Sequence, residues 1–135
     1  MNNLKGACFY GGKESLFSDH LMVVISEPYQ GYSLAVPISS IKYKEDGTPR
    51  YYDKACVLEP TDIKQEDGRN VLTKKSFAFY KEAKEIAASQ VIYDQIQKTL
   101  LYRCNVTPNI LARVQQGAKE SSDLEERYEK YFIAF

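Results

Sequence analysis

The chain has 135 residues, a length that fits one domain. Its hydrophobic share of 44% is enough for one core and too high for a disordered chain. With 18 basic and 18 acidic side chains the net charge is zero, so overall charge favours neither a nucleic acid nor an acidic partner. A nucleic-acid-binding protein with this composition must gather its basic residues on one face.

The amino-terminal part of the chain reads as short strands separated by turns. One strand is expected over residues 6 to 10. A stronger one is expected over residues 21 to 26, which are branched and apolar on both faces. The segment "EPYQG" predicts a turn, because proline fixes one torsion and Gly31 tolerates positive φ. The next segment, "YSLAVPI", completes a hairpin, with Pro37 expected at a strand end or a sheet edge.

Polar loops separate the strands that follow. Residues 42 to 53, "KYKEDGTPRYYD", contain an Asp-Gly turn signal and a proline, which predict a loop. Residues 54 to 59 are expected to return as a strand. A second polar loop over residues 60 to 70 leads to a last strand over residues 71 to 80, where polar and aromatic residues alternate.

Beyond this strand the sequence predicts mainly helices. Near Ala83 the choice between strand and helix stays open. Thr107 can cap a helix whose first position suits Pro108, and Gly117 is expected to end it. A last amphipathic helix is expected over residues 121 to 132. The helix before Thr107 is indicated by apolar residues at helical spacing: Ile86, Val91, Ile92, Ile96, Leu100 and Leu101.

These elements predict one α+β domain. A small, curled β-barrel over residues 5 to 90 carries a helical extension over residues 91 to 135. The cysteines are odd in number and far apart, and the chain has one histidine, so we expect no disulfide, no metal and no cofactor. No segment approaches membrane-spanning length and the amino terminus has no long apolar stretch. We therefore expect a cytoplasmic protein without membrane contact.

Four short motifs in a fixed order suggest a family. They are "HLMVVISEP", "LAVPISS", "CVLEPTD" and "SFAFY". The set resembles the PemK/MazF-like toxins of bacterial type II toxin–antitoxin systems, in particular a divergent branch of them. The resemblance implies an SH3-like curled barrel, a homodimer that cleaves single-stranded RNA without a metal, and a cognate antitoxin protein as partner. It also implies that an arginine in the loop before the second strand and a threonine or serine after the third strand carry the reaction.

The site residues follow from matching these motifs one by one. The serine position falls on Ser39, with Ser40 beside it in "PISS". Where typical members of the family have arginine-proline before the second strand, this chain has His20-Leu21, and no arginine precedes Arg50. The preceding loop, "GGKESLFSD", offers Lys13 instead. The resemblance thus gives His20, Ser39, Ser40 and Lys13 as candidate catalytic residues.

Each of these residues has two interpretations. A histidine titrates near neutral pH, so His20 can act as acid or base, or it can simply begin a strand and bond the local backbone. Ser39 and Ser40 can donate to a phosphate or form a turn by bonding their own backbone. Lys13 is expected to balance the charge of the phosphate.

A second group of residues suggests RNA binding. Basic side chains alternate with tyrosines in the loop after the third strand, and proteins hold single strands with cations for phosphates and rings for bases. The other interpretation is a solvated loop, because Glu45, Asp46 and Asp53 dilute the positive charge. The candidate RNA-binding residues are Lys42, Tyr43, Lys44, Arg50 and Tyr51.

Three functions remain open from the sequence. The first is the toxin-like endoribonuclease. The second is an inactive barrel of the same fold that binds RNA or a protein without cutting, which the missing arginine and the neutral charge favour. The third is a structural or regulatory protein that pairs with a host component.

Overall fold

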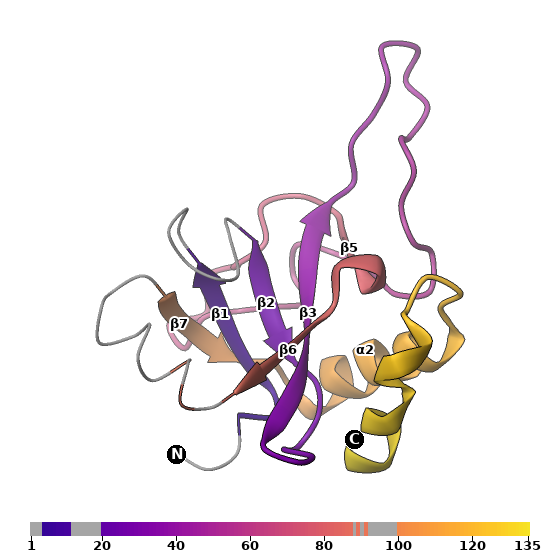
Figure 1. The fold of residues 1–135 in the computed structure, drawn as a ribbon. Helices are drawn as coiled ribbons and strands as arrows, with labels where there is room; N and C mark the ends of the chain where they lie inside the picture. The colour runs from indigo at the N-terminus through magenta and orange to yellow at the C-terminus, as the bar shows by residue number, and fades with distance from the viewer. Residues whose placement is uncertain (1–3, 12–19, 88, 90, 92–99) are drawn as a thin grey trace.

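The computed structural model describes residues 4–11, 20–87, 89, 91 and 100–135 (Figure 1). The candidate residue Lys13 and residues 92 to 99 of the helix expected before Thr107 lie outside the described residues. The strands are β1 (Ala7–Gly11), β2 (Leu21–Val24), β3 (Tyr32–Ser40), β4 (Val57–Leu58), β5 (Ser76–Ala78), β6 (Lys84–Ala87) and β7 (Leu100–Asn105). The helices are η1 (Tyr80–Glu82), α2 (Pro108–Glu120) and η2 (Glu126–Ala134), of which η1 and η2 are 3₁₀ helices.

The strands form one seven-stranded sheet in which every pair is antiparallel. The order is β4-β5-β3-β2-β1-β7, and β6 pairs with the first half of β3 (Figure 1). Within the described residues β4 and β7 stand at the two ends of this order, so the sheet is open. The α+β class predicted from the sequence is confirmed.

The hairpin of β2 and β3 forms where the sequence predicts it. Tyr29 and Tyr32 exchange backbone hydrogen bonds of 2.7 and 3.2 Å across a two-residue turn. The turn residues Gln30 and Gly31 have φ values of 52° and 88°. Positive φ at both central positions matches the right-handed twist of the flanking strands, which is why such turns join hairpins.

Pro37 lies inside a strand, so its expected place at a strand end or edge is wrong. It pairs with Met22 of β2. On its other side β3 pairs with β6 up to Ala35 and with β5 from Ile38 onward. Pro37 therefore falls where β3 changes partner, and the missing N–H interrupts neither ladder.

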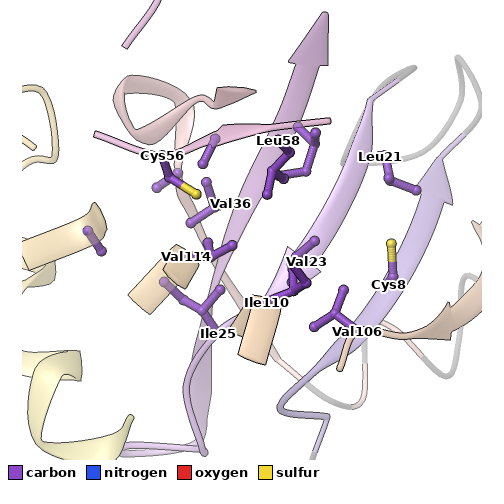
Figure 2. Packing of buried hydrophobic residues seen from close by; sticks show 14 of the residues in the cluster. Cys8, Leu21, Val23, Ile25, Val36, Cys56, Leu58, Val106, Ile110 and Val114 are labelled. Atoms are coloured by element: carbon purple, nitrogen blue, oxygen red, sulfur yellow. The ribbon is translucent and has the colours of Figure 1, made fainter. Parts of the chain in front are cut away.

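The central part of the sheet, around β2, is buried on both faces, as the apolar residues 21 to 26 predict. On one face Val23 and Ile25 of the β2 region pack with Ile110 and Val114 of α2 (Figure 2). On the other face a smaller cluster joins Leu4, Ala7, Phe9, Met22, Val24, Ala35, Ile86 and Val91. Burying both faces of a central hairpin fixes its register, because a shift of one residue exchanges the two faces.

The carboxy-terminal third differs from the helical prediction. The helical interpretation is wrong for Leu100 and Leu101, which begin β7 at the end of the sheet. The cap at Thr107 is confirmed, since its hydroxyl accepts a 3.3 Å hydrogen bond from the Ile110 amide. Gly117 does not end α2, which runs on to Glu120.

The last helix takes 3₁₀ geometry. The buried residues of η2 are Tyr128 and Tyr131, three positions apart, which is one turn of a 3₁₀ helix. Both tyrosines join the cluster beneath α2, so the chain end covers the core. Of the apolar end "YFIAF", Ile133 is 81% exposed.

Two further observations concern membrane-spanning helices and the three cysteines. Among the described residues, no helix is long and apolar enough to cross a membrane. Cys8, Cys56 and Cys104 are free thiols, and all of them are buried. Cys8 and Cys104 stand directly opposite each other in the β1–β7 pair, a proximity that their spacing in the sequence gives no sign of.

Candidate functional site

A cleft opens where β2 begins and β3 ends, and four of the candidate residues line it. Its volume is about 520 Å³. His20, Ser39, Ser40 and Lys42 line it, as the sequence-based assignment requires of a joint site. Further walls come from β1, from the segment before β5 and from β7, through Tyr10, Lys74 and Arg103.

The hairpin register brings His20 and Ser39 to the same end of the β2–β3 pair. Leu21 of β2 pairs with Ile38 of β3, the last pair at this end, and His20 and Ser39 come directly next to these two residues in the chain. Both His20 and Ser39 line the cleft. His20 is exposed and both serines are half-buried, so a ligand in the cleft can contact all three.

The end of β3 also pairs with β5. Ser39 pairs with Phe77 and Ser40 with Ser76 of β5. The hydroxyl of Ser76 donates a 2.8 Å hydrogen bond to the carbonyl of Lys74, which fixes the backbone that presents the exposed Lys74 side chain. The serines thus lie within a ladder, on a rigid part of the sheet, and they are not turn formers.

Arg103 enters the cleft through a β-bulge. The pairing of β1 with β7 shifts between Cys8 and Phe9, whose partners are Cys104 and Tyr102. Arg103 is therefore the extra residue of the bulge, and bulges redirect side chains at the margins of sites. Its guanidinium carbon lies 5.8 Å from the centre of the Tyr10 ring, a cation–π contact that orients it.

Sequence reasoning missed Arg103 because it assigned Leu100 and Leu101 to a helix. A signal was present: the apolar and aromatic run before Thr107 is short and ends directly at a helix cap, as a strand before a helix does. Lys74 was missed for another reason. It lies in a polar stretch, and only the pairing of β5 with β3 brings that stretch to the cleft.

Below Arg103 the two opposed thiols have different acidities. A hydrogen bond between the thiols raises the pKa of Cys8 well above its usual range, and burial raises it further. The same hydrogen bond lowers the pKa of Cys104. Both side chains are in the buried core cluster, so they support the bulge from below and are not part of the cleft surface.

Charge in the cleft is of one sign. Lys42, Lys74 and Arg103 are the basic residues that line it, and no aspartate or glutamate lines it in the described part of the chain. The whole chain is neutral. The cleft is thus the gathering of basic residues on one face that the composition requires of a nucleic-acid-binding protein.

The loop after β3 forms a projecting hairpin, residues 41 to 53, that stands out from the sheet (Figure 1). The amide of Lys44 donates to the Thr48 carbonyl at 2.7 Å, and the amide of Arg50 to the Lys42 carbonyl at 2.8 Å. At the tip Asp46 accepts hydrogen bonds from the amide and hydroxyl of Thr48, which lower the pKa of this exposed carboxyl.

The projecting hairpin separates the candidate RNA-binding residues. Lys42, at its base, lines the cleft. Tyr43 and Lys44 are exposed along one strand of the hairpin, with Tyr43 57% exposed. Arg50 and Tyr51 line a different hollow of about 500 Å³, whose other walls include Lys54 and Asp123. The structure therefore does not bring these residues to one surface.

The described residues contain no group of three or more His, Cys, Asp or Glu side chains that could hold a metal ion. No family model, no curated protein and no solved structure matches this chain. The residues that line the cleft include a histidine, two adjacent serines and three basic side chains.

Proposed function

We propose that the chain is an endoribonuclease that cleaves single-stranded RNA in this cleft without a metal. One observation carries the proposal: His20, Ser39 and Ser40 share a cleft whose charged neighbours are all basic. RNA cleavage by its own 2′-hydroxyl needs a base, a source of a proton, and fixed positive charge for the phosphate. The residues of the cleft cover each of these needs.

In the reaction we propose, His20 takes the proton of the 2′-hydroxyl as that oxygen attacks the neighbouring phosphorus. The new bond joins the 2′ oxygen to phosphorus, and the bond to the 5′ oxygen breaks. The protonated imidazole then returns the proton to the departing 5′ oxygen. Arg103 and Lys74 stabilise the extra negative charge on the phosphate, while the hydroxyls of Ser39 and Ser40 donate to its oxygens. The products are a 2′,3′-cyclic phosphate and a 5′-hydroxyl.

The test is cleavage of a long mixed-sequence RNA in the presence of a chelator. His20→Ala should reduce the rate by roughly 10²–10⁴-fold, the usual contribution of general acid–base catalysis. Arg103→Ala should cost about 10²–10³-fold, as loss of one donor to a developing anion does. Arg127→Ala is the matched control, because Arg127 is exposed on η2 and does not line the cleft. Equal cleavage by the parent and His20→Ala would remove the catalytic assignment.

A second candidate function is RNA binding without cleavage. It is favoured because His20 is the only histidine among the described residues that line the cleft, and no aspartate or glutamate joins it there. A single such group must serve as both base and acid. Fluorescence anisotropy with labelled RNA separates the two functions. Three phosphate contacts predict that log K falls with log salt at a slope of about −2, and Arg103→Ala should reduce this slope by about 0.7. Binding without products would support this second function.

The proposal includes the biological setting implied by the resemblance. We propose an SH3-like curled barrel of the PemK/MazF type, acting in the cytoplasm as a homodimer controlled by an antitoxin protein. The support is the ordered motif set, the curled path that lets β3 pair with β2, β5 and β6, and the exposed Ile133 at the chain end. Expression of the parent alone should arrest growth, and His20→Ala should relieve the arrest. Equal growth with both would contradict the toxin assignment.

A further inference from the structure

A shallow groove next to the cleft has a different chemistry. Its volume is about 340 Å³, and Gln65, Glu66, Asp67, Tyr102 and Arg103 line it. Gln65 and Arg103 also line the cleft, so the two hollows share a wall. A ligand that occupies the cleft at Arg103 can therefore extend into the groove. The charged side chains that line the cleft are all basic, whereas the groove is also lined by two carboxylates, those of Glu66 and Asp67.

The carboxylates decide which part of an RNA the groove can accept. They repel phosphates, which the basic cleft attracts, so the groove suits an uncharged part of the strand. Asp67 is already engaged, because it accepts bonds of 3.0 and 2.7 Å from the amide and the Nε of Arg69. Glu66 is exposed and is the carboxylate left to accept from a ligand. Glu66 and Tyr102 line the same groove. Burial of Tyr102 raises the pKa of its hydroxyl, and the charges of Cys104 and then Glu66 raise it further.

Glu66 is held in place by its turn. The amide of Gln65 donates to the Arg69 carbonyl at 2.8 Å, and the amide of Gly68 donates to the Gln65 carbonyl at 2.9 Å. Gly68 has a φ of 88°, which few residues other than glycine adopt without strain. These bonds close the loop into a tight turn with Glu66 near its tip. Less conformational freedom of this loop is therefore lost when a ligand binds.

Tyr102 supplies a supported ring. It is 42% exposed, and it packs edge-on against the buried Phe9 with ring centres 5.6 Å apart. A tyrosine ring with one edge fixed and a large part exposed can stack on a base, and stacking tolerates any base because each has a π-face. Selection must therefore come from Glu66, which as an ionised carboxylate accepts hydrogen bonds and donates none.

We propose that this groove is a subsite for a nucleobase with an exocyclic amine, stacked on Tyr102 and donating to Glu66. Cytosine, adenine and guanine carry such an amine, and uracil does not. The inference rests on the proposed function, because it assumes an RNA strand whose phosphate lies at Arg103. It adds a base preference that neither the motifs nor the cleft predict.

The test measures affinity by fluorescence anisotropy for labelled 2′-O-methyl octamers of cytosine, adenine and uracil, which cannot be cleaved through the 2′ oxygen. The parent should bind the cytosine and adenine octamers about tenfold more tightly than the uracil octamer. Glu66→Gln should bring this ratio close to one, since an amide can also donate to the uracil carbonyl. Tyr102→Ala should weaken all three by at least about fivefold, and Tyr102→Phe should not.

The matched control is Glu82→Gln, which removes an exposed carboxylate on η1, away from the groove, and should leave the ratio unchanged. Glu66 is exposed in its loop, so its variant tests the subsite even if Tyr102→Ala does not fold. Equal binding of the three octamers by the parent, or an unchanged ratio in Glu66→Gln, overturns the subsite and leaves RNA binding standing. No binding of any octamer at low salt overturns the RNA function and the subsite together.

Discussion

The contact between Gly117 and Tyr80 allows a sharp test of how α2 packs. In an exposed helix position, replacing glycine by alanine stabilises a protein by about 1 kcal/mol. Here an added Cβ would stand 2.2 Å from the Tyr80 hydroxyl oxygen and 2.9 Å from Cβ of Cys56. The Tyr80 hydroxyl is buried and donates a 2.6 Å hydrogen bond to the Val114 carbonyl. It cannot move away without losing that bond.

The expected change is therefore a loss of stability. Forcing extra volume into a packed core costs about 1–3 kcal/mol, and breaking a buried hydrogen bond costs about 1–3 kcal/mol more. Set against the gain in helix propensity, Gly117→Ala should lower the free energy of unfolding by about 2–4 kcal/mol. With a urea dependence of about 1–3 kcal/mol per molar, the unfolding midpoint should fall by about 1–2 M.

The assay is urea unfolding followed by far-ultraviolet circular dichroism, with two companions. Ala112→Gly is the matched control, because Ala112 is exposed on α2. This variant should lose only the higher helix propensity of alanine, about 1 kcal/mol of stability. In Tyr80→Phe/Gly117→Ala the clash with the hydroxyl is gone, so the double variant should be less damaged than the two single changes combined. If Gly117→Ala is as stable as the parent, the tight packing of α2 on Tyr80 is wrong.

Three further outcomes can be measured in the same way. Thr107→Ala should cost about 1 kcal/mol in urea unfolding by removing the cap of α2, while Thr107→Ser should keep most of it. Asp53→Ala should cost about 1.5–3 kcal/mol, because this buried carboxylate accepts bonds of 2.9 Å from the Ala55 amide and 2.5 Å from the Ser121 hydroxyl; full stability in the variant would contradict those bonds. Burial raises the pKa of Tyr131 to about 12. Because an unfolded tyrosine loses its proton near pH 10, this contribution to stability is complete below about pH 10 and is lost as the pH rises towards 12. Tyr131→Phe should make the alkaline decline in unfolding midpoint less steep, and an identical decline would show that Tyr131 is not the titrating group.

Much of the site follows from local rules. The turn at Gln30 and Gly31 between two apolar segments predicts a hairpin, and the hairpin register brings His20 and Ser39 to the same end of the β2–β3 pair. The capped start of α2 at Thr107 is equally local, because the cap is made within one turn of helix. In these cases residues close in sequence determine the structure.

The remaining part depended on contacts between distant segments. Arg103 reaches the cleft only because β7 pairs with the distant strand β1, with a bulge at that residue. Gly117 resembles a helix end in sequence, yet it is required inside α2 by the Tyr80 side chain. The local preferences of glycine do not show whether it ends a helix or lies inside one. Those of arginine do not show whether its side chain lines a cleft. The sequence by itself thus determined the turns, the cap and the histidine–serine pair, whereas tertiary packing decided which cations face that pair.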